Sequence, residues 1–227
     1  MLKNLINLLF PKLCAGCNSL LLQNEVIICT NCRHELPLTQ HHLIHNNYIA
    51  KKFYGIIPVE FCSAMLYFHK DGIVQNMIHH LKYKNQPEIG TFLGNWYAND
   101  LQVIAKDQKF TTIIPVPLHK KRYRERGYNQ VTTFCEALSQ NLGIEINDQL
   151  LYRKIYSKTQ TKKSKEARSE IKNSLFDVTF SSSDCGKHFL LVDDVITSGA
   201  TLEACAKAIL KIPDAKISII TIAYTDS

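Results

Sequence analysis

The apolar residues from position 61 onward follow a strand pattern and then a helix pattern. Residues 61–68, FCSAMLYF, form a continuous apolar and aromatic run, which is typical of a strand buried on both faces. After Asp71, which can cap a helix, apolar residues recur at the spacing of one helix face; they are Ile73, Val74, Met77, Ile78 and Leu81. We expect this helix to end before Pro87, because a proline opposes its continuation.

The same alternation continues to residue 224. It predicts three further helices, over 89–104, 128–141 and 199–210. It also predicts four further strands, over 110–117, 150–156, 187–194 and 215–224. Strands that alternate with helices favour an α/β fold, a parallel sheet with helices on both faces. Ligands of such sheets bind beyond the carboxyl ends of the strands, so we expect binding at the loops after Ile114 and Val192.

Four cysteines form two Cys-x2-Cys pairs, Cys14 with Cys17 and Cys29 with Cys32. When two such pairs converge, their thiolates complete a closed tetrahedral shell that suits structural Zn2+. Two disulfides, or an iron centre with the same ligands, are the alternatives, and His34 can replace a cysteine. The spacing therefore predicts a small zinc knuckle whose folding depends on its metal.

The knuckle is expected to end near a polar, weakly periodic stretch. We place the knuckle at 1–40, a linker at 41–58 and the main domain at 59–227. The linker histidines His41, His42 and His45 are interpreted as plain polar residues rather than metal ligands.

The remaining cysteines indicate the cellular compartment. They stand singly in apolar surroundings and are interpreted as small core residues in a reducing compartment; they are Cys62, Cys135, Cys185 and Cys205. The apolar run before Cys14 is too short, and too interrupted by asparagine, to cross a membrane, and we find no small-residue cleavage site beside it. We expect a cytoplasmic protein without membrane insertion.

The charge of the chain is concentrated in one region. The 227 residues carry a formal net charge of +7, and residues 119–172 hold 13 of the 27 Lys and Arg but 6 of the 20 Asp and Glu. The whole basic excess therefore lies in about a quarter of the chain, which favours an anionic partner at one surface. A solvated basic loop is the alternative.

The stretch LLVDDVITSGAT, residues 190–201, combines two acids with a small, hydroxyl-bearing loop. The loop over 197–201 opens a predicted helix, where free amides and the helix dipole favour a phosphate. Asp193 and Asp194 would repel a phosphate, unless they accept hydrogen bonds from sugar hydroxyls or share Mg2+ with it. A phosphorylated ribose meets both requirements.

This stretch resembles the signature of type I phosphoribosyltransferases, which bind phosphoribosyl pyrophosphate (PRPP). The resemblance implies that fold, with Asp193 and Asp194 as the catalytic pair facing the ribose hydroxyls. It implies a PRPP-binding loop that comprises Val195, Thr197, Ser198, Gly199, Ala200 and Thr201. Ser198 replaces the commoner threonine of the signature, and a phosphate donor is kept.

A second unusual stretch, PVPLHKKRYRERGYNQ, follows the strand over 110–117. In phosphoribosyltransferases the corresponding loop approaches the pyrophosphate, so Pro115, Val116 and Pro117 are expected to contact PRPP. The basic residues suit that charge, and we expect Arg126 to be the closest of them.

The complete pattern resembles the ComF-like (competence protein F) family. The shared motifs are the Cys-x2-Cys pairs, LKYK at 81–84, PVPL with RERGYNQ, KTQ at 158–160, Arg168, Asn173 and the terminal signature. The resemblance implies a role in natural transformation, in which incoming single-stranded DNA is handled in the cytoplasm. It implies PRPP bound with Mg2+, and competence-machinery proteins as partners.

Two functions remain open at this point. An active enzyme would transfer phosphoribosyl from PRPP to a nucleobase or related nucleophile, with the loop over 157–172 closing over the site; no segment specifies a base. A DNA-handling protein would use a basic surface formed by Lys120, Lys121, Arg122, Arg124 and Arg126, with Tyr123, Tyr128, Tyr152 and Tyr156 available to stack on bases. The knuckle can also dock a partner protein.

Overall fold

A computed structural model of the chain describes residues 11–154 and 175–225. Its centre is a five-stranded sheet whose order is β1-β7-β6-β2-β3, and every neighbouring pair is parallel. The strands are β1 Phe61–Tyr67, β2 Thr112–Pro115, β3 Glu145–Ile146, β6 His188–Ile196 and β7 Lys216–Tyr224. The predicted α/β fold with a parallel sheet is therefore confirmed.

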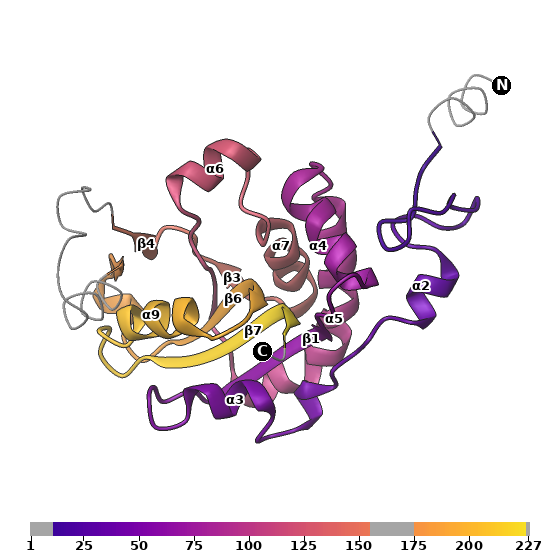
Figure 1. Ribbon diagram of the computed structural model, residues 1–227. Coiled ribbons are helices and arrows are strands. Elements are labelled where there is room, and N and C mark those ends of the chain that lie inside the picture. The colour runs from indigo at the N-terminus through magenta and orange to yellow at the C-terminus, as the bar shows by residue number, and fades with distance from the viewer. Residues whose placement is uncertain (1–10, 155–174, 226–227) are drawn as a thin grey trace.

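Helices cover both faces of this sheet (Figure 1). One face packs against α4 Ile73–Tyr83, α5 Glu88–Gln108 and α7 Thr132–Leu142. The other face packs against α3 Tyr48–Phe53 and α9 Ala200–Ile209. A small antiparallel pair, β4 Leu151–Arg153 with β5 Phe176–Val178, lies against α9. The described residues also form α2 Thr30–His34, α6 Lys120–Arg126 and the 3-10 turns η1 His41–Leu43 and η3 Ser182–Asp184.

Strand β6 shows why the sheet needs two helical layers. Leu190 and Val192 belong to the core beneath α4, α5 and α7, whereas Phe189 and Leu191 belong to the core beneath α3 and α9. All four side chains are fully buried. Because neighbouring residues of a strand point to opposite faces, a continuous apolar run requires cover on both sides.

The structure differs from the predicted elements at several places. Gly72, rather than Asp71, is the N-cap of α4, and Asp71 takes a positive φ of 57°. Residues 120–126, expected as a loop, form helix α6, whose cap His119 accepts a hydrogen bond from the Lys121 amide. Strand β6 continues to Ile196, two residues beyond its predicted end, so the two acids lie inside the strand rather than at its end. The part of the predicted strand 150–156 beyond residue 154 lies outside the described residues.

The segment over 41–58, expected as a linker, packs on the main domain. It forms η1 and α3, whose residues Ile49 and Phe53 are almost completely buried. The Asn47 amide donates to the Cys62 carbonyl of β1 at 2.7 Å. The domain boundaries at 40 and 58 stay a prediction.

The cysteine-rich segment also packs on the main domain. Cys14 and Cys32 are 0% and 2% exposed and share a core with Met77 of α4. Along the described parts of the chain, no helix combines the length and hydrophobicity required to cross a membrane.

Candidate functional site

Two neighbouring carboxylates form the floor of the candidate site, near the carboxyl end of β6. Asp194 is 6% exposed, while Asp193 is half-buried. One oxygen of Asp194, Oδ2, lies 2.8 Å from Lys82 Nζ and accepts a hydrogen bond from Gln130 Nε2 at 2.6 Å. Its other oxygen accepts from the Val195 amide at 2.6 Å. The Asp194 carboxylate is therefore held in one orientation by groups from α4, the segment before α7, and β6.

Asp193 stands in a less favourable environment for a negative charge. Burial, together with the adjacent Asp194 carboxylate, raises the pKa of Asp193 from 3.8 to about 7. A hydrogen bond from the Asp194 amide to Asp193 Oδ1, at 2.8 Å, opposes this rise in pKa, as do Lys82 and Arg122. Near neutral pH, a cation at the floor would therefore favour the doubly ionised pair.

The small-residue loop follows the carboxylates directly. Gly199 is the N-cap of α9 and has a φ of 80°, a conformation that residues with a Cβ rarely adopt. Thr197 and Ser198 are exposed, and α9 begins at Ala200. The amides at this helix end have no partners within the helix, so the loop presents donors beside the two acids.

A cleft of about 760 Å3 opens over the floor. Among the residues predicted to bind PRPP, those that line it are Val116, Pro117, Asp193, Asp194, Val195, Thr197 and Thr201. The other predicted loop positions, Pro115, Ser198, Gly199 and Ala200, lie next to these in the chain. The structure therefore brings the two loops selected from the sequence to one cleft.

Arg126 does not line this cleft and instead binds two neighbours. Its guanidinium donates to Gln130 Oε1 at 2.7 Å and to the Tyr83 hydroxyl at 3.3 Å, and its Cζ lies 5.1 Å from the centre of the Tyr83 ring. Arg122 of α6 and Arg153 of β4 line the cleft in its place. Sequence reasoning did not select Arg153.

Sequence reasoning also assigned no individual role to Lys82 and Gln130, although both bind Asp194. They occur in LKYK and RERGYNQ, which were noted as shared motifs without a chemical role. The motifs themselves were thus the available signal. Of the remaining shared motifs, KTQ at 158–160, Arg168 and Asn173 lie outside the described residues, as do the loop over 157–172 and Tyr156.

Helix α6 forms an exposed basic surface beside the cleft. The helix buries none of its residues, and Lys120, Lys121, Arg122 and Arg124 are all exposed. Tyr123, on the same helix, is 53% exposed, and Tyr152 is 42% exposed. Tyr128 is half-buried because its hydroxyl donates to the Leu81 carbonyl.

The four N-terminal cysteines form a second cluster, away from the cleft. The sulfurs of Cys14, Cys17, Cys29 and Cys32 all lie within 4.8 Å of one another, and those of Cys17 and Cys29 are 3.7 Å apart. Sulfurs around a tetrahedral Zn2+ are separated by about 3.8 Å, given a Zn–S distance of about 2.3 Å. The cluster can therefore hold a metal ion.

The donor chemistry of this cluster also fits a metal site. The Cys29 amide donates to Cys14 Sγ at 3.2 Å and the Cys32 amide to Cys29 Sγ at 3.4 Å, as suits thiolates. All eight cysteines, each within the described residues, are free. Three of the four single cysteines are buried as expected, whereas Cys185 is exposed, because it lies at the end of η3; its interpretation as a core residue was wrong.

A family model for the phosphoribosyl transferase domain matches residues 132–227. The fold, the cleft and this match define the class: the chain has a phosphoribosyltransferase domain. Among curated proteins, it is 33% identical over 152 residues to competence protein F of Haemophilus influenzae, which covers 63% of this chain and 64% of the relative. These matches, with the cysteine cluster, agree with the predicted resemblance to the ComF-like proteins.

Two other curated relatives are more distant. Competence protein ComFC of Bacillus subtilis is 25% identical over 151 residues, 66% of this chain and 58% of the relative. DNA utilization protein YhgH of Escherichia coli strain K12 is 28% identical over 138 residues, 60% of each chain. The matches thus span about three fifths of the length of these relatives.

Two solved phosphoribosyltransferase structures match parts of the chain. A purine phosphoribosyltransferase from Pyrococcus horikoshii matches with a TM-score of 0.38 and 18% identity, over 59% of this chain and 81% of that one. The adenine phosphoribosyltransferase from Leishmania tarentolae matches with a TM-score of 0.37 and 11% identity, over 78% of this chain and 88% of that one.

Proposed function

We propose that the chain binds PRPP in the cleft beside Asp193 and Asp194. The proposal rests mainly on one observation: the two acids and Thr197 and Thr201 of the following loop line the same cleft. The volume of about 760 Å3 lies within the usual range for small-molecule sites. A phosphorylated sugar uses both features, since its phosphate requires donors and its hydroxyls require acceptors.

Each part of PRPP has a chemically suited partner. The 5′-phosphate is assigned to the loop over 197–201, and the ribose hydroxyls to Asp193 and Asp194. The pyrophosphate is assigned to Arg122 and Arg153, which line the cleft and can bind phosphate oxygens through paired donors. Carboxylate oxygens and a pyrophosphate are also the ligands that Mg2+ prefers, so the floor suits Mg2+ bound together with PRPP.

Titration calorimetry tests this assignment. PRPP with Mg2+ is expected to bind more tightly than either ribose 5-phosphate or pyrophosphate, because it engages both ends of the cleft. A pyrophosphate affinity equal to that of PRPP would contradict the role assigned to the loop over 197–201 and to the two acids.

We further propose that the chain supports the handling of single-stranded DNA during natural transformation, in the cytoplasm. The exposed cations of α6, with Tyr123 among them, supply the phosphate contacts and stacking surface that single strands require. The competence and DNA-utilization names of the relatives agree with this role. Competence proteins are the expected protein partners. The four-cysteine knuckle is assigned structural Zn2+, since four thiolates leave no open position.

A second candidate function is transfer of phosphoribosyl from PRPP to a nucleobase or a related nucleophile. The cleft extends beyond the acids to Phe68, Ile78 and His79, which provides space and apolar walls for an acceptor. Incubation with PRPP, Mg2+ and each nucleobase in turn separates the two functions. Release of pyrophosphate with one base supports the transferase, whereas PRPP binding without release supports the DNA-handling role.

A further inference from the structure

Helix α4 contacts both the cysteine knuckle and the carboxylate floor. One side of the helix carries Ile73, Asn76 and His80, at intervals of three and four residues, and these residues meet the knuckle or the groove beside it. Another side carries Gln75, Ile78, His79 and Lys82, which line the cleft. Figure 1 shows α4 between the N-terminal segment and α7.

The contact on the knuckle side is close and specific. The Asn76 side chain donates to the Gly16 carbonyl at 2.7 Å, and Gly16 lies between the two cysteines of the first pair. A Cβ at Gly16 would lie 2.8 Å from Ile73 Cγ2 and 2.9 Å from Cys32 Sγ. The first pair of metal-binding cysteines is thus fitted directly against α4, with no room for a side chain between them.

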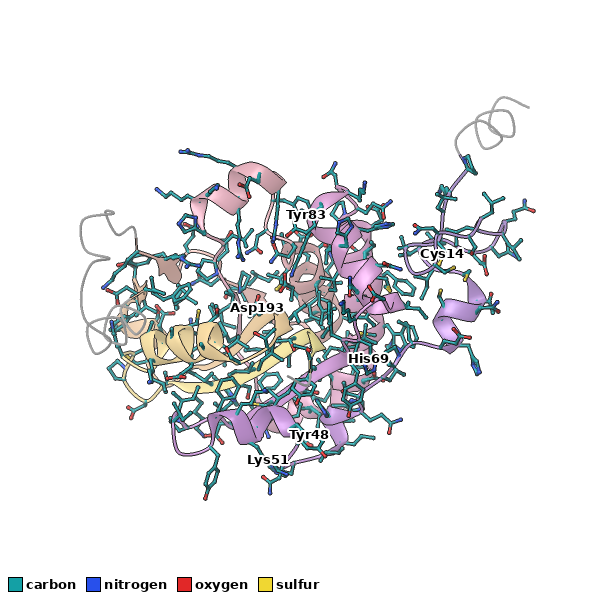
Figure 2. The ribbon with its side chains drawn as sticks, viewed as in Figure 1. Cys14, Tyr48, Lys51, His69, Tyr83 and Asp193 are labelled. Carbon is teal, nitrogen blue, oxygen red and sulfur yellow. The ribbon has the colours of Figure 1, made fainter. Side chains whose placement is uncertain are left out.

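The contact on the cleft side is the ion pair of Lys82 with Asp194. The Lys82 side chain is 18% exposed and that of Asp194 9% exposed, so water screens this pair poorly. Removing one partner from such a pair leaves a poorly solvated charge. Because Lys82 reaches Asp194 from the last turn of α4, its position depends on where the whole helix lies. Figure 2 shows Asp193 and Cys14 on opposite sides of α4, with Tyr83 near the end of that helix.

We propose that α4 couples the knuckle to the ligand site: the metal-bound knuckle holds the helix where Lys82 binds Asp194. Lys82 is then a positioning residue for Asp194. The contact between Asn76 and Gly16 links the position of α4 to the metal-bound form of the knuckle. Loss of the metal loosens the segment around Gly16, the helix shifts, and Asp194 loses its cation. The ligand in this proposal is the one assigned under the proposed function, so the coupling is tested with and without PRPP.

A thermodynamic cycle that combines zinc removal with the substitution Lys82→Met measures the coupling, with PRPP affinity as the readout. Removing zinc with a zinc-selective chelator, in the presence of excess Mg2+, is expected to weaken PRPP binding about tenfold in the wild type, within the usual range of couplings between sites. With zinc bound, Lys82→Met is expected to weaken PRPP binding by a similar factor. Chelation of zinc is then expected to change the PRPP affinity of this variant less than twofold. Lys82→Arg is expected to retain most of the affinity and its dependence on zinc.

Two further variants separate the coupling from a simple loss of charge and from loss of the metal itself. Lys84→Met removes the same charge from the exposed end of α4, beside the knuckle groove, and is expected to behave as the wild type. Asn76→Ala keeps all four cysteines, so it tests the link in a metal-bound protein, where it is expected to weaken PRPP binding. Equal effects of chelation in the wild type and in Lys82→Met would overturn the proposal.

Hydrogen exchange tests the coupling without PRPP. Chelation is expected to increase amide exchange not only over residues 11–36 but also along α4, because the helix loses one of its supports. An increase confined to residues 11–36 would overturn the proposal. If no variant binds PRPP in either metal state, the proposed function fails, and the exchange result still decides whether α4 responds to the knuckle.

Discussion

The floor of the cleft and helix α6 lie side by side and are both highly charged, yet they are built differently. Asp194 is buried, and each of its oxygens has a specific partner. Helix α6 has no buried residue, and its ion pair between Lys121 and Glu125 is long, at 3.8 Å, and exposed. The floor therefore offers fixed geometry, whereas α6 offers mobile charge.

This difference indicates what each region can recognise. Fixed acceptors select one small ligand, because a misplaced hydroxyl or cation loses its partner. Exposed lysines and arginines bind any polyanion, because the release of counterions does not depend on sequence. One protein can thus combine a specific small-ligand site with a tolerant nucleic-acid surface.

Salt is expected to separate the two regions most strongly. If the four exposed cations of α6 contact single-stranded DNA, the affinity falls about 50-fold between 50 and 200 mM salt, from a log–log slope of about −0.7 per contact. The affinity for PRPP with Mg2+ is expected to fall less than about tenfold, because one of its two assigned cations, Arg153, is partly buried and Asp194 at the floor is buried, which weakens screening. Fluorescence anisotropy and calorimetry over one salt series measure both. Equal slopes would contradict the distinction.

The pH dependence of stability tests the cost of ionising Asp193 at the floor. Asp193 has a raised pKa of about 7 in the folded state, against 3.8 when unperturbed, so the folded protein holds a proton that the unfolded chain releases. Stability is therefore highest below this window and falls as the pH rises through it. The free energy of unfolding of Asp193→Asn, relative to that of the wild type, is therefore expected to increase by roughly 2 kcal/mol as the pH rises from about 5 to 8. Asp107→Asn, at an exposed residue, is the control and should show no such trend in urea unfolding.

Substitutions on α6 should affect DNA and leave PRPP binding unchanged. Lys120→Ala with Arg124→Ala removes two exposed charges, which is expected to reduce the salt slope by about 1.4 and the DNA affinity about tenfold at low salt. Neither residue lines the cleft, so PRPP binding should stay within twofold. A matched loss of both affinities would indicate that the two regions act as one site.

The smallest expected effect is that of Gly199→Ala in the loop over 197–201. Alanine at a φ of 80° is strained, and its Cβ would lie 3.3 Å from two atoms of the Phe53 ring. We expect a loss of about 1 kcal/mol in stability and a severalfold weaker affinity for PRPP, with DNA binding unchanged. Thermal unfolding and calorimetry measure these changes. An unchanged PRPP affinity would show that this loop does not contribute to PRPP binding.

The fold was predictable because its core is regular. The apolar runs that became β1, β6 and β7 are continuous, and such runs identify strands buried on both faces. The loop over 197–201 was predictable for a similar reason, since a strand, a small-residue turn and a helix follow in order. These features are local in sequence, so periodicity and turn chemistry suffice to find them.

The partners of the acids were not predictable, because they come from distant segments. The LKYK motif marks Lys82 without a chemical role; its contact with Asp194 requires α4 and β6 to be placed relative to each other. Helix α6 was missed because it has no apolar face, and its ends are set by the His119 cap and by Gly127 at a φ of 78°. Arg126 was expected at the pyrophosphate, but its turn of α6 faces Tyr83 and Gln130.

Titration of PRPP into the double variant Asp193→Asn/Asp194→Asn, with and without Mg2+, tests the central claim most directly. Asp107→Asn/Asp214→Asn makes the same change in charge at two exposed residues before β2 and β7, away from the cleft, and is the matched control. We predict that the double variant loses at least about 100-fold in affinity, and the effect of Mg2+ with it, as removal of paired charge-assisted contacts implies, while the control binds as the wild type. Equal affinity in the double variant and the wild type would contradict the assignment of this cleft to PRPP.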